Sequence, residues 1–332
     1  MASRALTGET KGGRLIFLCG DDMADGGEVR AWGELIPDAL GLIFRNLPLQ
    51  EILTVIPRVC KSWRRAVSGP YCWQEIDIDE WSQRCKPEQL DRMLHMLIDR
   101  SCGSFRRLSV FGLHTESMFT FIADHAGSLE RLELPRSEIS DSIVELIAPR
   151  LSSLTYLDVS YCSKIGARAI EVFGKHCRSL VFLRRRMHPL EVAGDYDCQE
   201  EEAFAIAKTM TKLRHLEMSC QHSTTQGVLE ILSKCRDLEY LDVRGCWEVK
   251  LDKKYLEEWH SGLKVLGPEI EDRYECADYY SDTSAYSWRS ISDDEDMMWE
   301  DINAMEGEDF QVRFYGGGFN DVETGYDWPP SP

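Results

Sequence analysis

Apolar residues recur through the middle of the chain in the pattern L-x-x-L-x-L, whose last two positions alternate with polar ones as in a β-strand. Copies of the pattern, named by their first apolar residue, begin at Trp73, Phe105, Leu129, Leu154, Leu180, Leu213, Leu238 and Leu263. The copy at Leu263 is truncated, and in the copy at Leu180 a charged residue, Arg185, stands where the third apolar residue is expected. The pattern predicts a short strand in each copy.

The copies from Phe105 onward are separated by 24, 25, 26, 33, 25 and 25 residues. Apart from one expanded unit, this spacing falls within the roughly 20–29 residues of leucine-rich repeats. The second half of a unit carries apolar residues at helical spacing, for example Met118/Phe121/Ile122, Ile143/Leu146/Ile147 and Val228/Ile231/Leu232. Each unit is therefore predicted to be strand, turn and helix. Because one unit cannot bury its own apolar faces, the units are expected to stack into a curved α/β solenoid over residues 79–266.

Four cysteines fit this repeat as small core residues. Cys162 and Cys246 stand eight residues after their repeat starts, where leucine-rich repeats place Asn or Cys. Cys177 and Cys235 stand three residues before the next repeat start. The chain has no C-x-x-C spacing and is long enough to fold without disulfides, so the thiols are expected to be reduced and the chain to be cytoplasmic or nuclear.

Residues 35–68 have a different pattern, which predicts three short amphipathic helices separated by prolines. The first begins at Pro37, the second is expected to end at Pro57, and the third contains Cys60 and Trp63. These helices carry more apolar residues than they can bury among themselves. The remaining apolar residues predict an apolar face that contacts either a partner protein or the first repeat of the solenoid.

The sequence of this helical module resembles an F-box. The matching segments are Leu-Ile-Pro-Asp-Ala-Leu-Gly-Leu-Ile-Phe at 35–44, Leu-Pro-Leu at 47–49, Val-Cys-Lys-Ser-Trp-Arg at 59–64 and Tyr-Cys-Trp at 71–73. The usual opening Leu-Pro is replaced by Ile36-Pro37. With the repeats that follow, residues 32–266 resemble the F-box/leucine-rich-repeat proteins. The segment 32–77 is most similar to plant F-box proteins labelled as having WD repeats, although this chain carries no WD-repeat signature.

This resemblance implies a substrate-receptor subunit of an SCF ubiquitin ligase. The F-box, residues 32–78, would bind a Skp-family linker and through it the cullin and the RING subunit. The residues that the family pattern places in contact with the linker are Ile36, Pro37, Leu40, Ile43, Phe44, Leu47, Pro48, Leu49, Ile52 and Leu53. Cys60 and Trp63 would hold the three helices together. The alternative is a leucine-rich-repeat scaffold or small-ligand receptor that is not coupled to ubiquitination.

The strand-lined concave surface is the expected site for a target protein. Positions beside the last two apolar residues of each repeat point outward from a strand. The predicted target-binding residues, chosen for aromatic and arginine side chains typical of protein interfaces, are Tyr156, Phe182, Arg184, Arg186, His215, Tyr240, Arg244 and Trp247. The arginine run 184–186 lies in the expanded unit, whose extra residues predict a loop on the binding face. A locally irregular, solvated repeat is an equally open interpretation.

Charge separates the C-terminal segment of the chain from the rest of it. The formal net charge is −19, and residues 267–332 hold 18 acidic and three basic residues, a net of −15. This segment lacks repeat periodicity and is predicted to be a disordered acidic tail, and residues 1–31 a flexible extension. The remaining body is nearly neutral, so an acidic target, or the tail itself, remains possible at the concave face.

No catalytic motif is present. The chain has no P-loop, H-E-x-x-H or G-x-S-x-G sequence and no His/Cys spacing typical of zinc, so we expect no cofactor or metal and a non-catalytic adaptor. The acidic balance argues against nucleic acid and anionic membranes as partners. No apolar run reaches the roughly 18 residues needed to span a bilayer.

Overall fold

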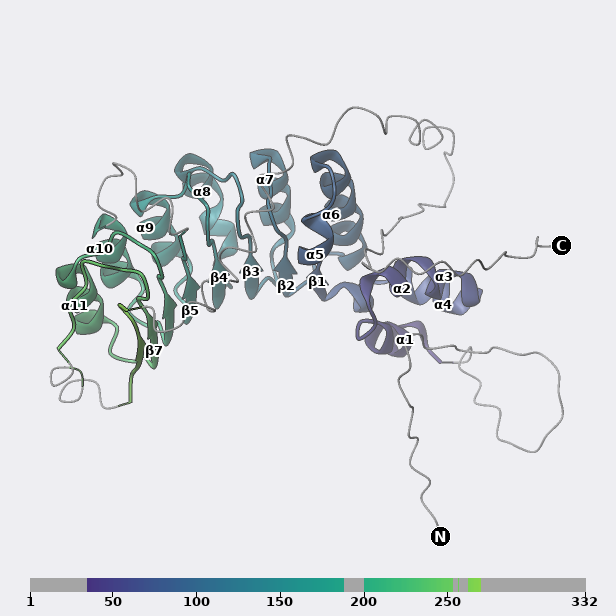
Figure 1. Ribbon diagram of the computed structural model, residues 1–332. Coiled ribbons are helices and arrows are strands. Elements are labelled where there is room, and N and C mark those ends of the chain that lie inside the picture. The colour runs from purple at the N-terminus through teal and green to yellow at the C-terminus, as the bar shows by residue number, and fades with distance from the viewer. Residues whose placement is uncertain (1–34, 188–199, 253–255, 257–261, 270–332) are drawn as a thin grey trace, which may run out of the picture.

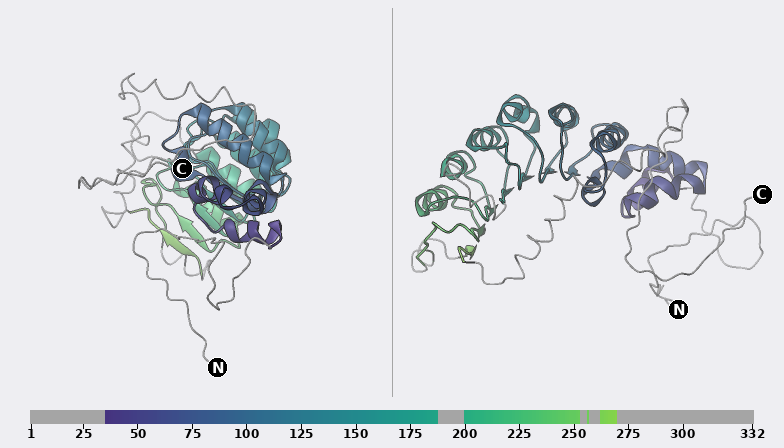
Figure 2. Two further views of the ribbon diagram at one scale, coloured as in Figure 1. Left: turned by 90° about the vertical axis from the view of Figure 1, so that its right-hand side faces the viewer. Right: turned by 45° about the horizontal axis from the view of Figure 1, so that its top comes forward.

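The computed structural model describes residues 35–187, 200–252, 256 and 262–269. In these residues the chain forms a small helical module followed by an arch of repeats, with helices on the outer side and strands on the inner side (Figures 1 and 2). The predicted extension 1–31, the tail beyond 269 and the loop of the expanded repeat in 188–199 lie outside the described residues. No helix in the described ranges is long and apolar enough to cross a membrane.

The helical module contains four short helices rather than three. They are α1 (Pro37–Phe44), α2 (Leu49–Thr54), α3 (Ile56–Val59) and α4 (Lys61–Ser68), followed by the 3₁₀ turn η2 (Pro70–Trp73). The prediction that Pro57 ends the second helix was wrong, because Pro57 lies in the first turn of α3. Proline is tolerated there because the first turn has no carbonyl partner for its backbone nitrogen.

One parallel sheet of eight strands, ordered β1 to β8, lines the inner side of the arch. The strands are β1 (Glu75–Asp77), β2 (Arg107–Ser109), β3 (Arg131–Glu133), β4 (Tyr156–Asp158), β5 (Phe182–Arg184), β6 (His215–Glu217), β7 (Tyr240–Asp242) and β8 (Lys264–Leu266). Each strand pairs with the next in one constant register, so equivalent residues of successive repeats stand side by side. This confirms the predicted solenoid, since every strand coincides with a copy of the sequence pattern.

Helices cover the other face of the sheet. They are α5 (Asp79–Ser82), α6 (Pro87–Ser101), α7 (Glu116–His125), α8 (Asp141–Ile147), the 3₁₀ turn η3 (Ala148–Leu151), α9 (Ala167–His176), α10 (Glu200–Thr209) and α11 (Thr225–Lys234). One apolar assignment was wrong. Leu146 is 61% exposed, because α8 buries the face centred on Ile143, Val144 and Ile147.

The four repeat cysteines lie in the core as predicted, and each Sγ–H donates to a carbonyl of the preceding repeat. Cys162 reaches the Leu134 oxygen at 3.2 Å and Cys246 the Met218 oxygen at 3.2 Å. Cys177 and Cys235 make the same kind of contact with the ends of earlier helices. Burial raises the pKa of all four thiols to about 12, so they are inert, protonated packing groups.

Arg185 stands at the repeat position where the sequence pattern calls for an apolar core residue, and its side chain is fully buried. Its guanidinium forms a two-point ion pair with Glu202 of α10, with N–O distances of 3.1 and 3.2 Å. It also donates to the carbonyl oxygens of Val159, Cys162 and Ile165. The charged residue therefore replaces an apolar contact with a buried polar network that ties β5 to α10 and to the turn after β4.

Candidate functional site

The helical module is held together by an aromatic core. The rings of Phe44 in α1 and Trp63 in α4 have centroids 4.9 Å apart, and both residues are buried. The Trp73 indole donates to the Val67 carbonyl oxygen at 2.7 Å, which fixes η2 against the end of α4. Trp63 thus has the structural role predicted for it, and Cys60 packs beside this core.

The ten residues predicted to contact a linker divide into two sets. Leu40, Phe44 and Ile52 are buried within the module and belong to its own core. The others reach the surface wholly or in part: Ile36, Pro37, Ile43, Leu47, Pro48, Leu49 and Leu53. Only the residues of the second set are accessible to a partner protein.

The module exposes five large apolar side chains, here together called the module face: Leu35, Ile36, Leu42, Ile43 and Val55. Ile36 is 65% exposed and Ile43 is 43% exposed. Ile36 is the extended residue immediately before α1, and Ile43 lies in the last turn of that helix. The alternative in which this face packs against the first repeat is wrong for these five side chains. Exposed apolar groups at this density are typical of a protein-binding surface.

A stack of four rings, the aromatic ladder, crosses the concave face. It consists of Tyr156, Phe182, His215 and Tyr240, which occupy the same register position in β4 to β7. Successive ring centroids are 4.0, 4.0 and 4.1 Å apart, with interplanar angles of 18°, 10° and 6°. A stacked pair of the Tyr156–Phe182 type contributes about 0.5–1.5 kcal/mol beyond burial. The ring faces are occupied by one another, so a partner meets the ring edges.

Cations occupy the same register position at both ends of the ladder. The Arg131 guanidinium carbon lies 3.8 Å from the Tyr156 ring centroid, and the Lys264 ammonium lies 5.6 Å from that of Tyr240. Sequence reasoning missed both cations, as well as Arg107 and Glu133. All four stand at register positions that the repeat pattern already marks as outward, so extending the register to β2, β3 and β8 would have found them.

A row of charged residues, the charged row, runs beside the ladder two residues further along each strand, on the same face of the sheet. It consists of Glu133, Asp158, Arg184, Glu217 and Asp242. Arg184 binds Glu217 through two N–O contacts of 2.9 and 3.1 Å and reaches Asp158 at 3.3 Å. The guanidinium therefore bridges the carboxylates of the strands on its two sides.

The carboxylates of the charged row lie beneath cations. The Glu217 carboxylate also accepts a hydrogen bond from the His215 ring nitrogen at 2.8 Å and forms an ion pair with Arg186. Arg244 covers Asp242 with N–O contacts of 3.0 and 2.8 Å. Arg107 and Arg131 cover Glu133. The predicted target-binding arginines are thus oriented by carboxylates of the same chain.

The predicted target-binding residues do not all belong to one surface. Tyr156, Phe182, His215 and Tyr240 form the ladder, and Arg184, Arg186 and Arg244 lie beside it. Trp247 is 65% exposed but belongs to the turn beyond β7, outside both rows. The hydroxyl of Tyr156 is buried, and burial raises its pKa to about 12, so this group stays neutral and lies beneath the surface that a partner meets.

Glu217 gives the charged row a measurable pH signature. Burial alone would raise the pKa of its carboxyl, but hydrogen bonds from Arg184 and the charge of Arg186 lower that pKa to about 2. Because the folded-state pKa lies below the unfolded value, the ionised carboxylate stabilises the fold above the unfolded pKa. This stabilisation is lost as the pH falls through the folded-state value.

Replacing Glu217 by Gln is expected to lower the free energy of unfolding by about 2 kcal/mol near neutral pH, since the covering arginines are partly screened by water. The difference from the unmodified chain should shrink as the pH falls from about 4.5 toward about 2. Urea unfolding across this range measures it. The control Glu239→Gln removes an exposed pairing with Arg214 and should change stability by less than about 0.5 kcal/mol. A Glu217→Gln effect that is independent of pH would contradict the assignment.

Within the described ranges, no three His, Cys, Asp or Glu side chains are grouped to hold a metal ion. The charged row is instead a set of paired carboxylates and guanidinium groups whose directional N–H donors face the concave side. Such an arrangement can orient a bound polypeptide by hydrogen bonds.

Comparisons with known proteins agree with this architecture. The profile of the F-box-like family matches residues 37–79. The chain is 52% identical over 316 residues to the F-box protein FBW2 of Arabidopsis thaliana, a match that covers 92% of this chain and 98% of that protein. It is 31% identical to the F-box protein SKIP19 of the same plant, covering 87% of this chain and 90% of that one. It is 32% identical to the putative F-box/LRR-repeat protein 9, also of Arabidopsis thaliana, covering 68% of this chain and 92% of that one.

Proposed function

Because the chain belongs to the family of plant F-box proteins, we propose that it is the non-catalytic substrate-recognition subunit of an SCF-type ubiquitin ligase. The module face would bind a Skp-family linker, which in turn carries the cullin and the RING subunit. The concave face would bind a target protein. The observation that carries the proposal is the coincidence of the F-box-like match with an exposed apolar face on α1.

The separation of the two surfaces supports this assignment. The module face lies at the N-terminal end of the arch, and the aromatic ladder lies across β4 to β7 (Figure 1). The Trp73 contact with α4 joins the module to the strand β1 that follows it. A rigid connection of this kind holds a target at a fixed place relative to the ligase. Attack of a target lysine on the ubiquitin carrier then becomes effectively unimolecular.

The proposed linker contact is tested by replacing Ile36 and Pro37 with Ala in the full chain. Co-purification of the Skp-family linker and the cullin is expected to fall at least about tenfold, because the change removes the most exposed apolar side chain of the module face. A thermal melt should show that the fold is retained, since Ile36 is 65% exposed.

The matched control is Leu146→Ala, which removes an equally exposed leucine from α8 of the solenoid and should leave linker capture unchanged. Retention of the linker by the Ile36/Pro37 variant would overturn the module-face assignment. Failure of the unmodified chain to capture any Skp-family linker would favour the alternative, a repeat scaffold that is not coupled to ubiquitination.

A further inference from the structure

The charged side chains of the concave face are layered by sign. Between β3 and β7 the carboxylate side chains are nearly covered: Glu133 is 11% exposed, Asp158 7%, Glu217 5% and Asp242 0%. The cations above them remain accessible: Arg131 is 40% exposed, Arg184 and Arg186 29% each, and Arg244 19%. An approaching chain therefore meets guanidinium groups and ring edges, although the row below is acidic.

The cationic layer extends to the last described strand. Lys264 in β8 is exposed and stands in the register position of the ladder. At the opposite end of the sheet the sign reverses, because Glu75 and Asp77 of β1 are exposed. The part of the concave face from β3 to β8 therefore has the charge that complements a negatively charged ligand.

The guanidinium groups on this face are held in place before any ligand binds. Each is fixed by a carboxylate beneath it, so little side-chain entropy is lost when its outer N–H groups donate to a second acceptor. The ligand that fits is a polypeptide with carboxylates at short spacing. A neutral or basic segment would offer these donors only neutral acceptors such as backbone carbonyl oxygens, whose hydrogen bonds are weaker than those of carboxylates.

The chain itself continues into such a polypeptide. Residues 267–332 carry a net charge of −15, and the run Asp293-Asp294-Glu295-Asp296 is followed by further acidic residues up to Asp309. The last described residues pass beside Arg244 of the cationic layer, since the Pro268 carbonyl oxygen accepts a hydrogen bond from the backbone N–H of Gly245, the residue after Arg244. We propose that this acidic segment, residues 290–313, binds the concave face between β3 and β8 and occupies the surface intramolecularly.

The lengths permit this contact. From β8 to β3 there are five inter-strand steps of about 4.8 Å, roughly 24 Å in all. Asp293 stands 24 positions after Glu269, enough to reach any point of the face at about 3.3 Å per extended residue. A tether of this kind gives an effective concentration on the order of millimolar, so weak individual contacts suffice to fill the site. Competition with a target protein at this face rests on the proposed function, whereas the intramolecular contact does not.

Zero-length carbodiimide coupling in the full chain tests the contact. Arg131→Lys places an amine at the β3 end of the cationic layer and keeps the positive charge beside Glu133. The tryptic peptide 290–313 contains nine carboxylates and no lysine, so each of its cross-links reports the introduced amine or another lysine of the chain. The expected result is at least about tenfold more cross-linked peptide from position 131 than from a matched control position.

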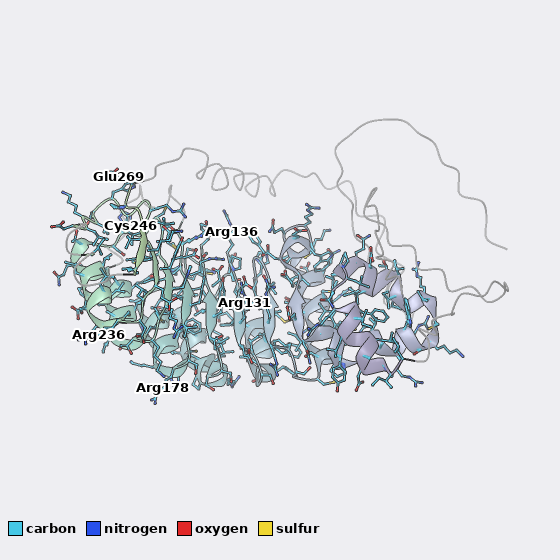
Figure 3. The ribbon with its side chains drawn as sticks, turned by 90° about the horizontal axis from the view of Figure 1, so that it is seen from below. Arg131, Arg136, Arg178, Arg236, Cys246 and Glu269 are labelled. Carbon is cyan, nitrogen blue, oxygen red and sulfur yellow. The ribbon has the colours of Figure 1, made fainter. Side chains whose placement is uncertain are left out.

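The control is Arg178→Lys, because Arg178 lies at the edge of the ribbon opposite to Arg136 and Glu269 (Figure 3). Cross-links of equal yield from positions 131 and 178 would overturn the proposal. Coupling at about 0.5 M NaCl should lower the yield from position 131 severalfold, since exposed charges are then screened beyond about 4 Å. A yield that does not depend on salt would also count against it.

A mixture of ¹⁵N-labelled and unlabelled chains identifies the occupant. The proposal requires cross-links within one chain, and a majority of mixed-isotope cross-links would overturn it in favour of a second copy. Replacing Asp293, Asp294, Glu295 and Asp296 with Asn or Gln should reduce coupling of the remaining carboxylates of the peptide to position 131 at least threefold. This test needs neither the linker nor a target, so its failure is distinct from failure of the proposed function.

Discussion

Replacing Arg185 by Leu is expected to destabilise the solenoid by about 3–5 kcal/mol, even though leucine is the residue that the repeat pattern favours at this position. The change leaves the Glu202 carboxylate buried without its cation and removes donors from the carbonyl oxygens of Val159, Cys162 and Ile165. Gln221 still donates to Glu202 at 3.2 Å, but a neutral amide does not replace an ion pair. Urea unfolding near neutral pH measures the loss.

A double-mutant cycle separates the ion pair from the rest of the network. Glu202→Leu alone leaves the Arg185 guanidinium buried without its carboxylate. The double variant Arg185→Leu/Glu202→Leu leaves neither charge buried without a partner. The double variant is therefore expected to be more stable than the sum of the single effects by about 2 kcal/mol or more. Additive single effects would contradict a buried ion pair as the origin of the loss. The control is Arg178→Leu. Arg178 is an exposed residue in the turn after α9, so this variant should change stability by less than about 0.5 kcal/mol.

The repeat architecture could be predicted from the sequence because its signal is periodic. In seven of the eight strands the middle residue is a buried apolar side chain at the predicted position, and β8, where Val265 is half-buried, is the end of the array. Spacing of this regularity determines which residues share a register, and it therefore predicts that Tyr156, Phe182 and His215 lie on one face. The helical module was less predictable, since Pro57 is compatible with both the end of one helix and the first turn of the next.

The chemistry of the concave face required the tertiary structure. Register alone marks Asp158 and Glu217 as outward, yet both carboxylates are buried because Arg184 and Arg186 fold across them. The same pattern marks Arg185 as a defect, and its partner Glu202 lies 17 residues away beyond the expanded segment. Ion pairs of this kind depend on the length of the side chains and on their distance in space. The spacing of residues along the sequence predicts neither.

The layered charges also change how the concave face should be probed. Charge reversal at Arg184 would place a third carboxylate between Glu217 and Asp158, so a loss of target binding would be mixed with a loss of stability. Lys264 is exposed and contributes its charge above the Tyr240 ring. Substitutions at this lysine change the surface that a ligand meets with little effect on the charged row beneath it.

Replacing Gly174 by Val is expected to destabilise the solenoid by about 3 kcal/mol or more, because the end of α10 packs directly against α9 at this residue and leaves no room for a side chain. A Cβ atom built at Gly174 would lie 1.9 Å from the Thr209 hydroxyl oxygen, 2.6 Å from Thr209 Cβ and 2.9 Å from Met210 Cγ. The Thr209 hydroxyl cannot turn away without breaking its 2.7 Å hydrogen bond to the Ala205 carbonyl oxygen. The two helices must therefore separate, and their separation would also pull α10 and Glu202 away from Arg185.

The matched control for this substitution is Gly127→Val, at an exposed position where an added Cβ would meet no atom within 4 Å. Urea unfolding should show a change of less than about 0.5 kcal/mol for Gly127→Val and the large loss for Gly174→Val. The helix propensity of valine is slightly better than that of glycine, so backbone preference alone would make Gly174→Val mildly stabilising. A neutral or stabilised Gly174→Val variant would thus show that α9 and α10 can repack, and that close helix contact is not what requires glycine at this position.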